Sequence, residues 1–243
     1  WSLTSLKLLV GREKVARAVL MRSRTLLLAT SAFSLSLVSA FPTPALSALS
    51  TRSSASSTRS SITGLEMAAR LPKLVAFDLD ATLWYPEMYQ LWGGGAPFKP
   101  NKDGTLSDKS GTRCYLMGAS AKILSHLRTD PQWKDTKVAY VSCTDEPDWA
   151  EECMDLFRAG SLSLQQTVDI KEIYKANKNK HFQSLHKKTG IPYEDMIFFD
   201  NENHNCVNVQ PLGVTCIYTP KGMTQEAWEQ GLAKHAKAEV SAR

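Results

Sequence analysis

The sequence contains few cysteines and none of the spacings that would give them a structural role. Only five of its 243 residues are cysteines, and all five lie beyond residue 110. Their number is odd and no two form a C-x-x-C pair, so neither a disulfide framework nor a zinc site is indicated. We therefore expect buried free thiols in a reducing compartment. The five are Cys114, Cys143, Cys153, Cys206 and Cys216.

The sequence from residue 71 onward also lacks an excess of positive charge. The formal net charge of the whole chain is +5, but residues 1–70 hold 9 of the 29 basic residues and only 2 of the 24 acidic ones. This leaves residues 71–243 with 20 basic and 22 acidic side chains. Nucleic-acid binding requires an excess of positive charge, which residues 71–243 lack, so we expect no nucleic-acid partner.

No apolar run is long enough to cross a membrane, but one near the start of the chain is typical of a targeting signal. The run from Thr25 to Val38 is shorter than the roughly 20 residues that a membrane helix needs. Met21 and two arginines precede it and small residues up to Ala40 follow it, as in a secretory signal peptide. The stretch Ser47–Gly64 then holds 8 Ser, 3 Thr and no acidic residue, which is typical of a transit peptide.

A signal peptide that ends at Ala-Phe-Pro (40–42) and runs into such a stretch resembles the bipartite presequences of secondary plastids. We therefore predict that residues 1–70 are a targeting presequence and disordered linker, and that residues 71–243 form the folded domain. The predicted location is a plastid, with no stable membrane anchor. Two alternatives stay open: a simple secretory signal followed by a linker, and a cytoplasmic protein translated from Met67.

Short apolar runs alternate with helical patterns in the folded part. Apolar runs of about four residues are typical of buried parallel strands, and apolar residues at helical spacing with capping residues predict helices between them. The predicted strands are 74–77, 138–141, 196–199 and 214–217, and the predicted helices are 119–127, one from Pro147, 181–188 and one from Thr224. The alternation predicts an α/β fold with a parallel sheet and helices on both faces. Turn signals within 97–117 predict a small β-hairpin, too short to be a cap domain.

The strongest chemical signal is Asp78-Leu79-Asp80-Ala81-Thr82, directly after the first predicted strand. Ligands of open α/β sheets bind at the carboxyl ends of the strands, so both carboxylates are expected in a binding crevice. Asp78 can attack phosphorus as a nucleophile, and Asp80 can protonate the leaving oxygen and then activate water. A divalent cation is needed to lower the repulsion among these acids and a phosphate. The alternative is a solvated Asp/Thr turn.

Polar residues end two further strands. Ser142 follows the second and can donate a hydrogen bond to a phosphate oxygen, while Asp200 and Asn201 follow the third and can supply oxygen ligands to a hard cation. Lys178, at the start of a helix in the intervening segment, can neutralise phosphoryl charge. Spacing alone does not choose among the four lysines of this segment, which are Lys171, Lys175, Lys178 and Lys180.

With these motifs, residues 71–238 resemble the magnesium-dependent phosphatase-1 family of the haloacid dehalogenase superfamily. The most specific segments are 71–74, 77–84, 103–105, Lys178 with His181-Phe182, 198–203 and 212–217. The resemblance implies a Rossmann-like haloacid dehalogenase fold with no large cap domain. It also implies that Asp78 is the nucleophile and Asp80 the acid and base. The resemblance implies that phosphate is contacted by the Leu79 backbone, Ser142, Cys143 and Lys178. It implies that the Mg²⁺ ligands are Asp78, Asp80, Asp200 and Asn201.

Three positions depart from the family pattern. Ala81 stands where the family usually has a bulky Tyr, which alters packing near the entrance. Cys143 stands where the family usually has Arg, so a bidentate anion contact is lost. Asn201 stands in place of the second residue of an Asp-Asp pair. Since an amide oxygen coordinates magnesium without contributing charge, we expect weaker metal binding. The small phosphatases of the polymerase tail domain resemble this site and use an Asp-Asn pair.

The function that follows is a magnesium-dependent phosphomonoesterase working through an aspartyl-phosphate. The resemblance implies phosphotyrosine-like or sugar phosphate substrates, carried by small molecules or phosphoproteins. A catalytically weakened module that binds phospholigands without turnover is the alternative, because Cys143 and Asn201 depart from the pattern. We expect a monomer.

Overall fold

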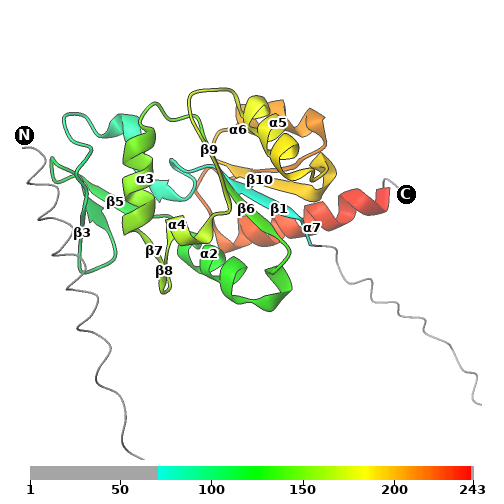
Figure 1. The fold of residues 1–243 in the computed structure, drawn as a ribbon, viewed down its shortest axis with the longest axis horizontal. Coiled ribbons are helices and arrows are strands. Elements are labelled where there is room, and N and C mark those ends of the chain that lie inside the picture. Colours follow the sequence, from blue (N-terminus) through cyan, green and yellow to red (C-terminus); the bar gives the residue numbers. More distant parts are fainter. Residues whose placement is uncertain (1–70, 242–243) are drawn as a thin grey trace, which may run out of the picture. The chain divides into compact units, whose positions relative to one another are not determined.

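The sheet at the centre of the domain is built from strands buried on both faces. The computed structural model describes residues 71–241, so the predictions for residues 1–70 lie outside the described residues and stay predictions. Five parallel strands lie in the order β11-β10-β1-β6-β9 (Figure 1). They are β1 (Leu74–Phe77), β6 (Lys137–Ser142), β9 (Ile170–Ile173), β10 (Met196–Asp200) and β11 (Thr215–Tyr218). The predicted parallel sheet is confirmed.

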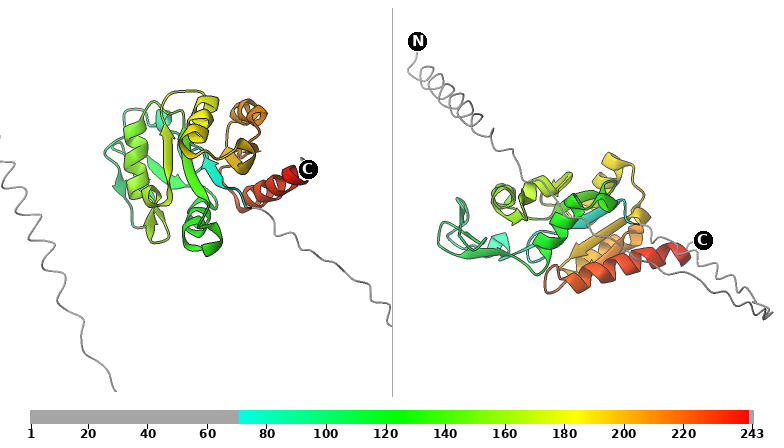
Figure 2. Two further views of the ribbon diagram at one scale, coloured as in Figure 1. Left: turned by 45° about the vertical axis from the view of Figure 1, so that its right-hand side comes forward. Right: turned by 90° about the horizontal axis from the view of Figure 1, so that it is seen from below.

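Helices cover both faces of this sheet, as predicted (Figure 2). The helices are α2 (Ser120–Thr129), α3 (Pro147–Leu156), α4 (Leu164–Thr167), α5 (Lys178–Thr189), α6 (Asn203–Val209) and α7 (Gln225–Ser241). Because side chains alternate along a strand, β1 contributes to two cores. Val75 and Phe77 pack with α2, α3 and α7, whereas Leu74 and Ala76 pack with α5 and α6.

Strand β9 and the short helices α4 and α6 were not predicted. The edge strand β9 contains Lys171 and Glu172, so it lacks the continuous apolar run of the central strands. Helix α5 begins at Lys178, as predicted, although the apolar helical pattern covers only 181–188. The Asn177 side chain accepts a hydrogen bond from the Lys180 amide and caps the helix at this earlier point. This earlier start places Lys178 in the first turn of the helix.

The insertion after β1 is larger than the predicted hairpin. It is a four-stranded antiparallel sheet in the order β2-β5-β4-β3. Its strands are β2 (Trp84–Tyr85), β3 (Lys99–Pro100), β4 (Leu106–Ser107) and β5 (Arg113–Leu116). The difference arises because Trp84, which is fully buried, pairs opposite Leu116 and extends the sheet back to the Asp78 loop. We call residues 84–116 the flap.

Short elements complete the described part of the chain. Strands β7 (Arg158–Ala159) and β8 (Leu162–Ser163) form a small ribbon, and 3-10 helices occupy Met88–Gln90, Pro131–Trp133, Tyr193–Asp195 and Gln210–Leu212. All five cysteines are free thiols, and four of them are buried. Among residues 71–241, no helix combines the length and apolarity needed to span a bilayer.

Helix α7 approaches the sheet at Gly231, which gives a stability prediction. A Cβ atom there would lie 2.6 Å from Phe199 Cζ and 2.9 Å from Ile197 Cδ1. Overpacking of this kind costs about 1–3 kcal/mol, whereas the higher helix propensity of Ala offsets about 1 kcal/mol. We therefore expect Gly231→Ala to lower the free energy of unfolding by about 1 kcal/mol in urea titrations. The exposed Ala233→Gly serves as the propensity control, and a stabilised Gly231→Ala would contradict the packing argument.

Candidate active site

The predicted site residues meet at the carboxyl edge of three adjacent strands. Asp78 follows β1, Ser142 ends β6 and Asp200 ends β10. An open cavity of about 240 Å³ lies over this edge. Its lining consists of Asp78, Asp80, Glu87, Tyr89, Ser142, Cys143, Thr144, Asp145, Lys178, Asn201, Glu202, His204 and Asn205. A larger cavity of about 600 Å³ lies between α2 and the start of α7, but no carboxylate lines it.

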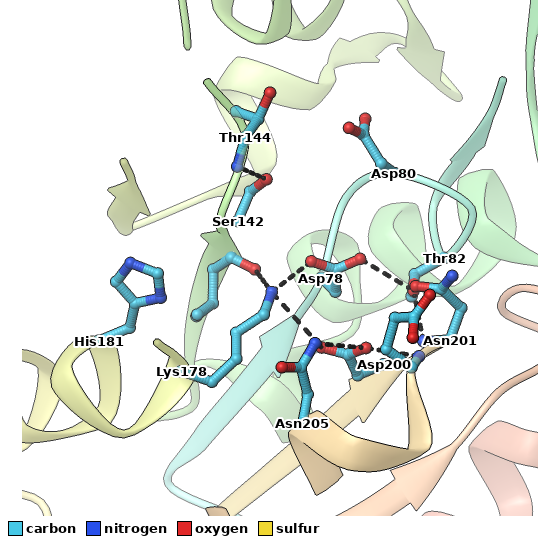
Figure 3. Close-up of polar contacts among 12 residues, drawn as sticks. Asp78, Asp80, Thr82, Ser142, Thr144, Lys178, His181, Asp200, Asn201 and Asn205 are labelled. Atoms are coloured by element: carbon cyan, nitrogen blue, oxygen red, sulfur yellow. Dashed lines mark hydrogen bonds and ion pairs between the residues drawn. The ribbon is translucent and has the colours of Figure 1, made fainter. Parts of the chain in front are cut away.

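The loop after β1 turns sharply, and the turn separates its two aspartates. The Asp78 amide donates to Phe199 O at 2.9 Å, which continues the sheet pairing. The Leu79 carbonyl then accepts from the amides of Thr82 and Leu83, and Ala81 adopts a left-handed conformation with φ 54°. As a result the Asp78 side chain enters the site, and that of Asp80 points to another wall (Figure 3).

Lys178 lies at the centre of the buried part of the site. Its Nζ donates to Asp78 Oδ1 and to Val141 O, the latter at 2.6 Å, and lies 3.4 Å from Asp200 Oδ2. The side chain is 1% exposed. Burial disfavours the charged ammonium, but the carboxylates of Asp78 and Asp200 outweigh this effect and raise the pKa of Lys178. The lysine ammonium therefore orients one oxygen of Asp78.

Asp200, Lys178 and Asp78 form one set of paired charges, which we call the ion-pair group. Its Oδ1 accepts from the Glu202 amide at 2.7 Å, and Asn205 Nδ2 lies 3.2 Å and 3.0 Å from its two oxygens. Burial and the charge of Asp78 raise the pKa of Asp200, while Lys178 opposes the shift. The Glu202 amide, the Asn205 side chain and Lys178 hold the Asp200 carboxylate beneath the cavity floor. The sequence did not single out Asn205, because its approach depends on the tight start of α6.

A second group of oxygen atoms gathers on the other side of Asp78. Thr82 Oγ1 accepts from the Asn201 amide at 2.9 Å and donates toward Asp78 Oδ2 at 3.3 Å. The inner atom of the Asn201 side-chain amide lies 3.2 Å from Thr82 Oγ1, 3.3 Å from Asp78 Oδ2 and 3.2 Å from the Asp80 carbonyl oxygen. We call these four groups the oxygen cluster.

The oxygen cluster fits a magnesium ion. Adjacent ligands of an octahedral Mg²⁺ lie about 3 Å apart, given Mg–O distances of about 2.1 Å. With Oδ1 as the inner atom, Asn201 faces a carboxylate oxygen and a carbonyl oxygen, an arrangement that a cation between them would stabilise. Among the described residues, no three His, Cys, Asp or Glu side chains converge on a metal position. The cluster supplies instead one carboxylate, one carbonyl and one amide.

Asp80 lies in the cavity wall with its carboxylate held by the flap. Oδ1 accepts from Trp84 Nε1 at 2.7 Å, and Oδ2 accepts from the Met88 amide at 3.2 Å. Burial and, to a lesser extent, the charge of Asp78 raise the pKa of Asp80 to about 7. Asp80 therefore contributes its carbonyl to the oxygen cluster and its carboxyl group to the opposite side of the cavity.

The remaining predicted residues lie along β6 and the first loop. Ser142 is buried, and its Oγ accepts from the Thr144 amide at 3.2 Å. Cys143 is half-buried in the cavity wall, and burial raises the pKa of its thiol. The Leu79 side chain is fully buried, so only its backbone can face the cavity. His181 is buried beside Tyr174 rather than in the cavity lining, which fits a structural role.

The mouth of the cavity carries acidic residues that the sequence did not single out. Glu87 and Glu202 both line it, and the pKa of Glu87 is raised by burial and then by the charges of Glu202 and Asp78. Glu202 lies 3.2 Å from the His204 ring, and Asp145 pairs with Lys175 at 3.2 Å. No fixed cation among the described residues pairs with Glu87. This mouth is unfavourable for a second anion beside a phosphate.

Comparisons of the sequence with known proteins support one family. The family model described as Acid Phosphatase matches residues 70–238. Human Magnesium-dependent phosphatase 1 is 38% identical over 175 residues, which cover 71% of this chain and 92% of that protein. A HAD-like hydrolase superfamily protein of Schizosaccharomyces pombe is 36% identical over 153 residues, covering 59% of this chain and 83% of that protein. A phosphatase domain from Bacteroides fragilis, crystallised with Mg, is 17% identical with a TM-score of 0.49, covering 67% of this chain and 41% of that one.

Proposed function

This chain belongs to the magnesium-dependent phosphatase-1 family of the haloacid dehalogenase superfamily, and we propose that Asp78 is the nucleophile of its reaction. The protein is a magnesium-dependent phosphomonoesterase. One observation carries the assignment of Asp78. Its carboxylate lies between the Lys178 ammonium and the oxygen cluster, with one oxygen directed to each. A carboxylate held in this way is oriented for attack at the cavity floor.

The oxygen cluster is the proposed magnesium site. Its ligands are the Asp78 carboxylate, the Asp80 carbonyl and the Asn201 amide oxygen, with Thr82 supporting two of them. A bound Mg²⁺ neutralises phosphate charge and polarises the phosphorus for attack. In this proposal Asp200 is a positioning residue that holds Lys178 from beneath the cavity.

The proposed reaction proceeds in two displacements. An Asp78 oxygen attacks phosphorus while the bond from phosphorus to the ester oxygen breaks, and Asp80 gives its proton to that leaving oxygen. Asp80, now a carboxylate, takes a proton from water, and the water oxygen attacks phosphorus while the bond to Asp78 breaks. Phosphate leaves, and both aspartates return to their starting states. Lys178 balances the negative charge of the phosphoryl group, and Ser142 donates a hydrogen bond to a phosphoryl oxygen.

The first test removes the nucleophile and the metal separately. We expect Asp78→Asn to lower kcat with an aryl phosphate by about 10³-fold or more, because the amide cannot form the phosphoenzyme. Excess chelator should abolish wild-type turnover, and Mg²⁺ should restore it. Asp145→Asn, an acid-to-amide change at the same cavity, is the control and should stay near wild type. Phospholigand binding by the wild type with no turnover would instead support a binding module.

The second test concerns the proton donor. We expect Asp80→Asn to lose about 10²–10⁴-fold in kcat with alkyl phosphates, because an alkoxide needs a proton to leave. The loss should be smaller with nitrophenyl phosphate, whose leaving group is stable as an anion. Steady-state rates on both substrates measure the difference, and equal losses would refute the role of Asp80. Urea unfolding should accompany the assay, because the change also affects the contact with Trp84.

We further propose that the substrate carries a neutral or positively charged group beyond its phosphate. Both candidate classes, phosphotyrosine-like side chains and sugar phosphates, fit an open cavity with no large cap among the described residues. The acidic pair of Glu87 and Glu202 at the mouth favours an amine and disfavours a carboxylate.

This substrate proposal is tested with matched pairs of substrates. We expect glucosamine 6-phosphate to be hydrolysed with a higher kcat/KM than glucose 6-phosphate, and phosphotyrosine peptides with flanking Lys better than those with flanking Glu. Glu87→Gln should reduce each preference about threefold to fivefold, as partly exposed charges do. Asp145→Asn is the control, since Lys175 already neutralises Asp145. Preference for glucose 6-phosphate together with preference for the peptides with flanking Glu would contradict the proposal.

A further inference from the structure

The side-chain amide of Asn201 fits its surroundings in two orientations. Its inner atom faces three acceptor atoms, Thr82 Oγ1, Asp78 Oδ2 and the Asp80 carbonyl oxygen, at 3.2–3.3 Å. With Nδ2 inward, two N–H hydrogens are shared among three acceptors. With Oδ1 inward, the carboxylate and carbonyl oxygens face a further oxygen, and only the Thr82 hydroxyl can donate to it.

The two orientations suit different states of the protein. Without a cation, buried acceptors need donors, and Nδ2 is the donor within reach. With a cation, the same position needs an oxygen ligand, because Mg²⁺ takes oxygen. Thr82 suits both states, since its oxygen accepts from the Asn201 backbone amide while its hydroxyl hydrogen turns to whichever acceptor remains.

We propose that Asn201 takes the place of the cation in the metal-free protein, donating through Nδ2, and turns Oδ1 inward when Mg²⁺ binds. This inference rests on the magnesium site of the proposed function and adds a role for one residue. Binding must then break the hydrogen bonds of Nδ2, which lowers the affinity for Mg²⁺. In return, no carboxylate faces Asp78 Oδ2 from position 201 in the metal-free site.

An aspartate at this position would reverse both properties. Its carboxylate would face that of Asp78 across about 3 Å in the metal-free protein, where like charges repel strongly. It would also add a full charge to the ligand set and lose no hydrogen bonds on binding. Asn201→Asp therefore tests the inference directly, and Asn203→Asp adds the same charge on the exposed first turn of α6.

The experiment measures Mg²⁺ affinity and stability on the chain of 243 residues. Titration calorimetry with MgCl₂ should show that Asn201→Asp binds about tenfold tighter or more. In EDTA its melting temperature should fall by about 5 °C relative to wild type, and saturating Mg²⁺ should remove the difference. Asn203→Asp should match wild type in both measurements. Unchanged affinity together with unchanged stability in EDTA would overturn the inference.

A second measurement uses the wild type, so it holds even if Asn201→Asp does not fold in EDTA. NMR of the ¹⁵N-labelled chain, with the Asn201 side-chain amide assigned from Asn201→Ala, reports which way Nδ2 points. Exchange of its hydrogens with water should be slow in EDTA and at least about tenfold faster with Mg²⁺, because Nδ2 then faces the cavity. Binding of Mg²⁺ without this change overturns the inference alone. Absence of any Mg²⁺ binding overturns the magnesium site of the proposed function as well.

Discussion

A buried ammonium group is the interaction on which the rest of the site depends. Lys178 is removed from water, and a charge in that position is tolerated only where its partners are close and hydrogen-bonded. Those partners come from three strands: Asp78 after β1, Val141 in β6 and Asp200 at the end of β10. The register of the parallel sheet must therefore bring these strand ends together before the lysine can be accommodated. The buried lysine is thus accommodated only where the strand order brings these three partners together.

The same carboxylate joins the ion-pair group to the oxygen cluster. Asp78 gives one oxygen to Lys178 and the other to Thr82 and the inner atom of Asn201, so the two groups share one rigid side chain. Asp200 and Asn201, although adjacent in sequence, belong to different groups, because successive residues at a strand end point in opposite directions. Of these two neighbours, Asp200 pairs with Lys178, whereas Asn201 belongs to the proposed magnesium site.

The sequence predicted the sheet and the location of the site better than it predicted the division of roles within the site. The apolar runs of β1, β6 and β10 are unambiguous because both faces are buried, whereas β9 has polar residues at the sheet edge and was missed. Lys178 was distinguished from its neighbours by resemblance alone, since four lysines share that segment. The anchoring of Asp80 by Trp84 could not be predicted, because it depends on how the flap pairs with the loop.

The pairing of Trp84 with Leu116 has an evolutionary consequence. One indole belongs both to the flap and to the contact that fixes Asp80, so the flap is anchored where it meets the loop after β1. Its far turns, at 101–105 and 109–112, are mostly exposed and make no contact with Asp80. Changes in the length or composition of those turns would leave the contact between Trp84 and Asp80 in place, and no residue of either turn lines the cavity. Descendants of such a scaffold can therefore vary these turns while the residues that line the cavity stay the same.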